Sequence, residues 1–489
     1  MGNDAHVLIG GRTVGSPMHA VHNPARARDI VGESALADAA LVDRAVRAAA
    51  AAAPGWAALT VTERRDALKA AAGAALEDFE NRARLLTNEQ GKVLWESMVD
   101  LAGAPYLLRE CRRLIERVAA EEIVDDERGR FVRRRRPVGV VAVIVPWNYP
   151  VLLAFNAIAP ALAAGDTVVV KPSELAPLAL TAVLHAVSAA LPDGVINVVP
   201  GDGAQTGHAL AAHPTVRRVM FTGGTAGGRE VMRAAAESIT GVGLELGGND
   251  PALVLESAVV DDALVTALRN SAFTCSGQVC FAIKRIYVHR SHFGDLVEAL
   301  AAVTDQLTVG DGLDPASSIG PLISAAALDR VQALIRDSAE IGGTVTELGR
   351  KLDPAGWERG HFLLPHLVTG IPQQSRLVAA EQFGPVLPIL PFDTENEAIA
   401  LANDSEYGLA ASVWSRDDEH AFAVARGIEA GTVFVNVHAA GASDHTTPFG
   451  GVKQSGIGRI NGWAGIEELT ETQMLIRRDD AANLPGPPA

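Results

Sequence analysis

Strand-like apolar runs and helical patterns alternate between residues 138 and 236, and this alternation limits the possible folds more than any other feature of the sequence. The runs follow one another, strand then helix, at residues 138–145, 152–164, 167–170, 179–190, 195–199, 204–211, 217–221 and 226–236. Parallel strands need crossover connections, which helices of this length supply. The alternation therefore predicts a parallel sheet of the kind that binds nucleotides.

The remainder of the chain extends the same class of fold. The first 115 residues are dominated by alanine-rich helical patterns, such as 41–53 and 61–76, and we interpret them as scaffold. Beyond Gly248 the alternation resumes as a strand, a helix and a strand at residues 252–255, 261–273 and 285–289. We therefore expect an α/β protein with two sheet-containing parts.

Charge and apolar patterning argue against two classes of function. The formal net charge is −16, which disfavours nucleic-acid binding because phosphate contacts need a basic surface. The one basic run, four arginines at residues 133–136, is interpreted as a solvated edge strand rather than a polyanion site. The uncharged stretch 138–165 is broken by Pro146, Pro150 and Pro160, so a membrane span is not expected.

The cysteines are sparse, and one of them stands out. The chain has only three, Cys111, Cys275 and Cys280, which is too few and too odd a set for a disulfide framework. With no signal-peptide pattern at the N-terminus, we expect a reducing, cytoplasmic compartment. Cys280 comes directly after a Gly-Gln turn, and we interpret it as a nucleophile.

Two glycine-containing turns each lie between a predicted strand and a predicted helix. Gly203 and Gly207 belong to the first turn, and Gly223 and Gly224 to the second. Free backbone N–H groups at such turns favour a phosphate. Neither turn is a P-loop, and glycine chosen for tight packing remains the alternative interpretation.

Lys171 and Glu174 follow directly after the predicted strand 167–170. Open α/β sheets bind ligands at the carboxyl ends of their strands. Glu174 can accept hydrogen bonds from two ribose hydroxyls while Lys171 donates one. The alternative is an exposed ion pair in a loop.

Seven segments, in order along the chain, resemble the aldehyde dehydrogenase superfamily, in its NAD(P)-dependent branch that releases a free acid. They are Pro146-Trp-Asn-Tyr-Pro150, Lys171-Pro-Ser-Glu174, Phe221-Thr-Gly-Gly-Thr225, Glu245-Leu-Gly-Gly248, Gly277-Gln-Val-Cys280, Glu381-Gln-Phe-Gly-Pro385 and Pro448-Phe-Gly-Gly-Val-Lys453. The flanks also fit, so the resemblance covers nearly the whole chain.

The resemblance implies a covalent mechanism. Cys280 is expected to attack the aldehyde carbon as a thiolate, giving a thiohemiacetal and then an acyl thioester. Glu245 matches the family's general base for hydrolysis, and Asn148 matches its side-chain oxyanion donor. Branches that hand the acyl group to coenzyme A tend to lack this carboxylate, so Glu245 favours a free acid. Cys275 stands where many relatives have Asn, and its role is open.

The same resemblance implies a nicotinamide cofactor. Glu381 and Phe383 match the residues that hold the nicotinamide ribose and ring. The other cofactor contacts implied are Ile144, Trp147, Lys171, Glu174, Gly203, Gly207, Gly223, Gly224, Leu246 and Gly247. A carboxylate at Glu174 would repel a 2′-phosphate, so NAD is expected, with NADP as the alternative. Gly224, often Ser in relatives, lacks one side-chain contact to the pyrophosphate.

The substrate is expected to be a small-molecule aldehyde. The tunnel residues implied by the resemblance are Tyr149, Leu153, Asn156, Val279, Phe281, Ser443 and Phe449. Relatives that handle apolar aldehydes often have aromatics at the positions of Asn156 and Ser443. No arginine lies between Asn436 and Phe449 to clamp a carboxylate, so we expect a polar or medium-sized neutral aldehyde. The histidines show no zinc spacing, and no metal is expected.

The expected architecture has three parts. A Rossmann-like NAD-binding domain comprises residues 1–115 and 138–247, and a second α/β catalytic domain comprises 248–455. A β-hairpin oligomerisation element and C-terminal arm comprise 116–137 and 456–489. In this family the hairpin reaches a second subunit, so a homodimer or homotetramer is expected. The alternatives are a CoA-acylating semialdehyde dehydrogenase and a catalytically idle structural protein on the same fold.

Overall fold

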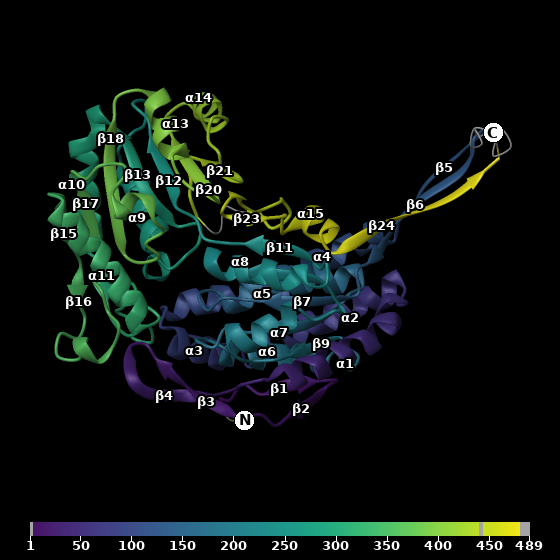
Figure 1. The fold of residues 1–489 in the computed structure, drawn as a ribbon. Coiled ribbons are helices and arrows are strands. Elements are labelled where there is room, and N and C mark those ends of the chain that lie inside the picture. The colour runs from purple at the N-terminus through teal and green to yellow at the C-terminus, as the bar shows by residue number, and fades with distance from the viewer. Residues whose placement is uncertain (1–2, 440–443, 480–489) are drawn as a thin grey trace.

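An eight-stranded sheet in the order β2-β1-β9-β8-β7-β10-β11-β23 forms the centre of the structure, a computed structural model that describes residues 3–439 and 444–479 (Figure 1). Its strands are β1 (Val7–Ile9), β2 (Arg12–Val14), β7 (Val140–Ile144), β8 (Thr167–Lys171), β9 (Ile196–Val198), β10 (Val216–Thr222), β11 (Gly241–Glu245) and β23 (Gly456–Ile457). The five strands from β9 to β11 are parallel to one another. The predicted parallel sheet is therefore confirmed.

The crossover helices also lie where the sequence predicts them. They are α5 (Pro150–Ala164), α6 (Leu178–Ala189), α7 (His208–Ala211) and α8 (Thr225–Ala236). Gly165, with φ +102°, ends α5 in a left-handed conformation. The helix predicted at 204–211 is also confirmed, although its first part, Gly203–Gly207, is a π-helical turn capped by the Asp202 side chain, and only His208–Ala211 is α-helical.

Helices cover both faces of this sheet. One face packs against α5 and α6, over which lie α2 (Val61–Ala74), α3 (Phe79–Gln90) and α4 (Leu94–Ala119). The other face packs against α1 (Ala39–Ala57), α7 and α8. Sequence order reverses between β7 and β10, and a parallel sheet binds ligands at the carboxyl ends of its strands beside such a reversal.

A second, seven-stranded sheet has the order β15-β17-β18-β13-β12-β20-β21. Its strands are β12 (Asp250–Val254), β13 (Ile283–His289), β15 (Thr344–Glu347), β17 (His366–Thr369), β18 (Val386–Phe392), β20 (Ala410–Trp414) and β21 (Thr432–Val435). All are parallel except β15. The helices around it are α9 (Asp262–Phe273), α10 (Phe293–Thr304), α11 (Ala325–Glu340), α12 (Arg376–Ala379), α13 (Glu395–Asn403) and α14 (Asp418–Ala425). This sheet confirms the second α/β region.

Strands occur near the N-terminus, where the sequence predicted mainly helix. Besides β1 and β2, the chain forms a hairpin of β3 (Met18–Asn23) and β4 (Arg26–Ala35). Two further small sheets pair β14 (Thr308–Val309) with β16 (Arg350–Lys351), and β19 (Tyr407–Gly408) with β22 (Val452–Lys453). Within the described residues, no helix is long and apolar enough to cross a membrane.

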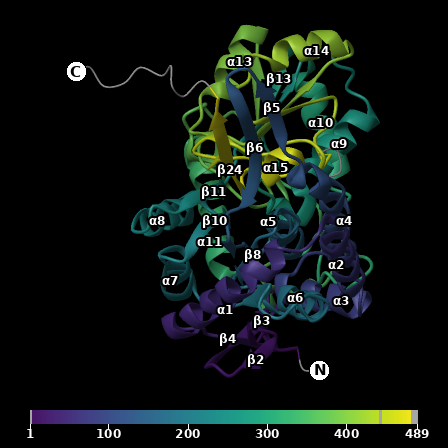
Figure 2. The ribbon, with the colours of Figure 1, turned by 90° about the vertical axis from the view of Figure 1, so that its right-hand side faces the viewer.

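A three-stranded arm extends away from the two sheets. It consists of β5 (Glu122–Asp126), β6 (Gly129–Pro137) and β24 (Thr470–Arg478); it protrudes from the rest of the chain in Figure 1 and lies in front of it in Figure 2. The interpretation of residues 133–136 as an edge strand is wrong, because β24 and β5 pair with opposite sides of β6. Two of its arginines form ion pairs, Arg133 with Glu122 and Arg135 with Glu467.

Candidate active site

A cavity of about 200 Å³ lies where the carboxyl ends of β10 and β11 meet the loop before β13. It brings together the three predicted catalytic residues, Cys280, Glu245 and Asn148. Seven predicted cofactor residues and one predicted tunnel residue also line it: Trp147, Gly223, Gly224, Leu246, Gly247, Glu381, Phe383 and Leu153. Its remaining lining residues, Pro146, Thr222 and Arg330, were not predicted.

The loop that carries Cys280 has an unusual backbone. Cys275, Ser276 and Gly277 have φ values of +51°, +55° and +74°, so three successive residues are left-handed. Asn tolerates this conformation better than most residues, which gives a physical reason why Asn suits position 275. The Gln278 side chain holds the loop, since its Nε2 donates to the Cys275 carbonyl at 3.0 Å and its Oε1 accepts from Ile323 N–H at 3.0 Å.

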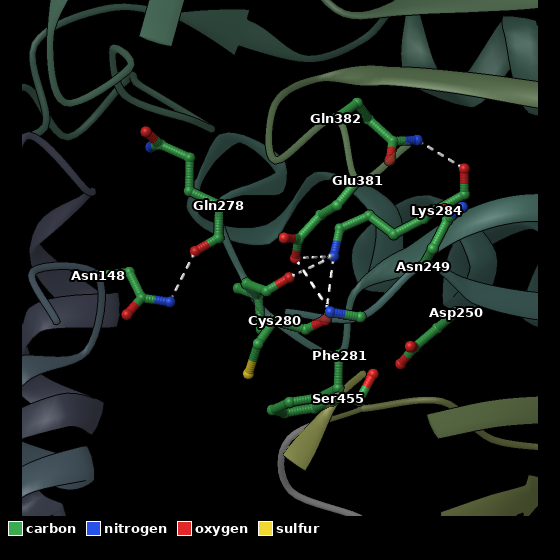
Figure 3. Close-up of polar contacts among 12 residues, drawn as sticks. Asn148, Asn249, Asp250, Gln278, Cys280, Phe281, Lys284, Glu381, Gln382 and Ser455 are labelled. Carbon is green, nitrogen blue, oxygen red and sulfur yellow. Dashed lines mark hydrogen bonds and ion pairs between the residues drawn. The ribbon is translucent and has the colours of Figure 1, made fainter. Parts of the chain in front are cut away.

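The surroundings of Cys280 favour the neutral thiol. Burial raises the pKa of Cys280 to about 12, and Lys284 is the charge that most opposes this rise. Lys284 Nζ donates to the carbonyl oxygens of Val279 at 2.7 Å and Cys280 at 3.1 Å. In Figure 3 the sulfur of Cys280 points away from this ammonium group. Lys284 therefore contacts the main chain of the nucleophile loop, while its charge lowers the pKa of the thiol.

Glu245 ends β11 and is buried beside Cys280. Burial raises the pKa of Glu245 well above the usual range of a carboxyl group, and the positive charge of Arg459 offsets part of the rise. A carboxylate with a raised pKa is a stronger base than an exposed one. Glu245 is therefore suited to take a proton from water or from a thiol.

Asn148 is fixed through both its side chain and its main chain. Its Nδ2 donates to the Gln278 carbonyl at 2.9 Å (Figure 3), and its own carbonyl accepts from Lys92 Nζ at 2.7 Å. Lys92 also pairs with Asp100 at 2.7 Å, and both of these side chains are fully buried. Asp100 in turn accepts from the Leu152 N–H of α5 at 2.6 Å. A buried ion pair thus anchors the segment that presents the Asn148 amide.

The same buried region contacts Cys275. Glu96 Oε1 accepts from the Cys275 N–H at 2.6 Å, and Gln90 Nε2 donates to the Cys275 Sγ at 3.6 Å. Burial raises the pKa of Glu96 to about 7 and raises the pKa of the Cys275 thiol. Cys275 is buried and unpaired, so it acts here as a packing residue of the nucleophile loop.

Glu381 and Phe383 form the wall of the cavity opposite Asn148. Glu381 Oε1 accepts from the Gly248 N–H at 3.2 Å, and a Cβ at Gly247 would lie 2.3 Å from Glu381 Oε2. Only glycine at position 247 therefore lets this carboxylate approach the main chain. The rings of Trp147 and Phe383 meet edge to face with centroids 5.6 Å apart.

The other predicted cofactor residues lie outside the cavity, at the carboxyl ends of β7, β8 and β9. Ile144 and Lys171 are register partners in β7 and β8. Lys171 Nζ donates to the Gly201 carbonyl at 2.6 Å and lies 3.7 Å from Glu174 Oε2. A Cβ at Gly207 would lie 3.5 Å from Lys171 Cε, and around Gly203 such a Cβ would meet open space. The structure thus gathers Ile144, Lys171, Glu174, Gly203 and Gly207 beside one sheet end.

The predicted tunnel residues divide into groups. Tyr149, Val279 and Phe281 cluster with Cys275, and the Phe281 and Phe449 rings meet with centroids 5.7 Å apart. Asn156 lies in a second, separate cavity. Ser443 lies outside the described residues.

Lys284, Lys92 and Arg459 were given no role by the sequence analysis. Lys284 interrupts a strand-like apolar run. A charged side chain in such a run is expected to be buried, and a buried charge needs partners. Lys92, Glu96 and Asp100 are spaced by four residues, which places charges on one helix face. These two patterns were available signals. Arg459 has no comparable signal, since β23 and its loop reach Glu245 only through the tertiary fold.

The parallel strand order, and a thiol beside two carboxylates in a cavity at the strand ends, are features of an α/β enzyme. The chain belongs to the aldehyde dehydrogenase family, which matches residues 13–475. It is 36% identical to the glutarate-semialdehyde dehydrogenase of Pseudomonas putida, over 93% of each chain. It is 39% identical to the geranial dehydrogenase of Castellaniella defragrans, over 93% of this chain and 95% of that protein.

A solved structure agrees with this assignment. Betaine aldehyde dehydrogenase of Staphylococcus aureus, crystallised in complex with NAD+, superposes with a TM-score of 0.92 at 33% identity, covering 96% of this chain and 94% of that one. The predicted family and the predicted enzymatic class are confirmed. Within the part of the chain that the structure describes, no group of three or more His, Cys, Asp or Glu side chains is arranged to hold a metal.

Proposed function

We propose that this aldehyde dehydrogenase oxidises its substrate to the free carboxylic acid, with NAD as the hydride acceptor, through a thiohemiacetal and a thioester on Cys280. The observation that carries the proposal is that one cavity holds the Cys280 thiol, the Glu245 carboxyl group and the Asn148 amide. A nucleophile, a base and a neutral hydrogen-bond donor are the three groups that acyl chemistry at an aldehyde carbon requires.

The first step needs a thiolate. When the Cys280 thiol loses its proton, the sulfur attacks the carbonyl carbon and the carbonyl π electrons move to oxygen. The Asn148 Nδ2–H and the Cys280 N–H are the donors proposed for this developing oxyanion, and one such donor is typically worth ~10²–10³ in rate. Burial raises the pKa of Cys280 to about 12, so the free thiol is protonated near neutral pH. Glu245, as the base, and the positive charge of Lys284 must therefore favour the thiolate.

The cofactor fits this chain's own residues. A Cβ at Gly224 would meet open space, and the free N–H groups at the start of α8 would hold a phosphate of the cofactor. Glu381 and Phe383 are proposed to hold the nicotinamide ribose and ring, and Lys171 and Glu174 the adenosine ribose. When bound, NAD would supply the hydride acceptor. Loss of the hydride would convert the thiohemiacetal on Cys280 into a thioester.

Hydrolysis completes the cycle. Glu245 is proposed to take a proton from water, whose oxygen then attacks the thioester carbon and displaces the Cys280 sulfur. The raised pKa of Glu245 suits this role, because burial makes the carboxylate a stronger base than an exposed one. Glu245 favours the free acid over acyl transfer to coenzyme A.

The cofactor preference and assembly state complete the proposal. Glu174, in the turn that follows β8, favours NAD over NADP through repulsion of a 2′-phosphate. The division into an NAD-binding domain, a catalytic domain and an oligomerisation element is proposed with the limits expected from the sequence. The protruding arm, with Ile123, Val124, Met474, Leu475 and Ile476 exposed, supports assembly with a second copy. The chain's cysteines are few and form no disulfide, which favours a cytoplasmic location.

A panel of aldehydes assayed for NAD reduction tests the reaction. We expect turnover of at least one aldehyde to its acid, and we expect Cys280→Ala to abolish turnover while NAD binding, followed by fluorescence, is retained. Wild-type turnover in Cys280→Ala would refute the nucleophile. Added coenzyme A that changes the product from acid to thioester would favour the CoA-acylating alternative, and no turnover of any aldehyde would favour the idle scaffold.

A further inference from the structure

A second cavity of about 260 Å³ lies between α4, α5 and the start of α15 (Gly462–Glu467). Its wall on α5 is Asn156, and Asn461 and Trp463 supply the wall on the other side. Leu153, three residues before Asn156 on α5, lines the active-site cavity. Residues three apart lie on the same side of a helix. The second cavity therefore begins about one helical turn along α5 from the first.

A second wall connects the thiol with this cavity. Phe281 follows Cys280, and its ring contacts that of Phe449. Phe449 and Ile460 exchange both main-chain hydrogen bonds, at 2.9 and 2.8 Å. Asn461 comes next in the chain. Two packed segments, α5 and the chain of contacts through Phe281 and Phe449, therefore join the surroundings of Cys280 to Asn156 and Asn461.

The two amides of this cavity lack partners. Asn156 and Asn461 are each 7% exposed, and the Oδ1 of each is buried without a hydrogen-bond partner among the described residues. The Nδ1 atom of His445, which also lines the cavity, is likewise buried and has no hydrogen-bond partner among the described residues. Buried polar groups are normally paired, so three unpaired groups around one cavity leave hydrogen-bonding capacity that a polar ligand group can use.

The charges around the cavity are occupied by the chain itself. Arg113 pairs with Glu110 at 2.9 Å, and the Arg117 guanidinium stacks on the Trp463 ring, 3.9 Å from its centroid. Arg113 and Arg117 are exposed at the rim, whereas the two asparagines are buried. The buried part of the cavity thus offers neutral amides, which match a neutral group better than a carboxylate.

We propose that this cavity binds the distal end of the aldehyde substrate and selects a neutral hydroxyl group there. A hydroxyl donates to an amide oxygen and accepts from an amide N–H, so it satisfies both sides of an asparagine. The remaining wall, including Leu107, Leu114 and Pro160, is apolar and packs against the carbon chain. This inference rests on the proposed oxidation at Cys280.

Three series of unbranched aldehydes of increasing length test the inference: alkyl, ω-hydroxy and ω-carboxy. At the length that reaches the second cavity, we expect kcat/KM for the ω-hydroxy aldehyde to exceed kcat/KM for the alkyl and ω-carboxy aldehydes of equal length by roughly tenfold or more. Asn156→Leu keeps the size of the side chain and removes its polar atoms. It should abolish that preference, so that the ω-hydroxy and alkyl aldehydes of that length have similar kcat/KM values.

The outcomes separate this inference from the oxidation itself. Oxidation of alkyl aldehydes without an ω-hydroxy preference at any length, or with a preference for the ω-carboxy series, would overturn the inference while the proposed reaction stands. If no aldehyde is oxidised, calorimetric titration with unbranched α,ω-diols and the matching mono-alcohols still decides. Tighter binding of the diol by the wild type, lost in Asn156→Leu, supports the subsite; equal binding refutes it.

Discussion

The ammonium group of Lys284 lies 3.6 Å from the Glu381 carboxylate while it holds the main-chain oxygens of Val279 and Cys280 (Figure 3). Lys284 is 2% exposed, so the pair is shielded from solvent. One buried charge therefore contacts both the nucleophile loop and the side chain proposed to hold the nicotinamide ribose. This arrangement makes Lys284 a positioning residue for the thiol.

Replacing Lys284 should make Cys280 less reactive. Burial raises the thiol pKa to about 12 and Lys284 lowers it, so Lys284→Met should raise it further and leave less thiolate at any given pH. We expect alkylation of Cys280 by iodoacetamide, followed by peptide mass spectrometry across an alkaline pH series, to slow by roughly tenfold, as for one pKa unit. Lys284→Arg should retain most of the rate. Matching profiles for Lys284→Met and the exposed control Lys351→Met would contradict this role.

Glu245→Gln should separate the two halves of the reaction. Glutamine keeps the shape of the side chain but cannot take a proton from water, so thioester formation should continue while hydrolysis stops. Rapid-mixing measurements should show about one equivalent of NADH per site followed by steady turnover reduced by ~10²-fold or more. Since the carboxyl pKa is raised, hydrolysis by the wild type should accelerate as pH rises through it, and the variant should lose that dependence. Steady turnover equal to that of Glu237→Gln, an exposed control, would exclude Glu245 as the base.

Glu174 should set the choice between NAD and NADP. Its side chain is 45% exposed beside Lys171, so it can face an adenosine ribose without large rearrangement. Glu174→Ser removes the charge that repels a 2′-phosphate and should raise kcat/KM for NADP relative to NAD by roughly tenfold. Initial rates with both cofactors measure the ratio. An unchanged ratio would mean that other groups determine the preference.

The buried pair of Lys92 and Asp100 should matter for both folding and rate. Lys92→Met leaves Asp100 buried without its partner, which typically costs about 3–5 kcal/mol. Urea unfolding should show that loss, and the free energy should recover partly in the double variant Lys92→Met with Asp100→Leu. The exposed residue Lys69 on α2 is the matched control, and Lys69→Met should change stability by less than about 0.5 kcal/mol. Equal stabilities of the two lysine variants would show that the pair contributes nothing net.

The arm should control assembly. Val124, Phe131 and Ile476 are cross-strand partners and form one row, in which Ile476 is 60% exposed. Ile476→Lys places a charge in this row, and we expect a smaller particle by sedimentation velocity with little change in thermal unfolding of the subunit. Val259→Lys, at a position 43% exposed elsewhere, is the control. A wild-type particle that is already monomeric, or a variant that sediments like the wild type, would remove the arm from the interface.

The sequence predicted the parts of the fold that depend on local pattern. Apolar runs and helical patterns predicted β7 to β10 and the helices that follow them, because each pattern matches the period of its element, whereas β11 was not predicted. The place of β6 in its sheet was mispredicted. It was expected to be an edge strand, but its second partner, β24, comes from the other end of the chain. Short strands such as β2 (Arg12–Val14), with two of three residues exposed, carry little apolar signal.

The same distinction holds for the site. Cys280, Glu245 and Asn148 lie in motifs, and the cavity that contains all three agrees with that prediction of proximity. The second cavity has no local pattern, since Asn156 and Asn461 meet only through the packing of α5 against α15. The spacing of residues along the sequence cannot predict a site whose residues come together only through such packing.

The pairing of β11 with β23 makes the strand that carries Glu245 depend on a late segment of the chain. Glu245 has Gly456 as its strand partner, and the arm closes only when Thr470–Arg478 reaches β6. While a ribosome is still adding the last few dozen residues, the strand that carries Glu245 has an open edge. A chain that stops before Gly456 therefore lacks the strand partner of Glu245 and leaves the edge of β11 open beside the thiol.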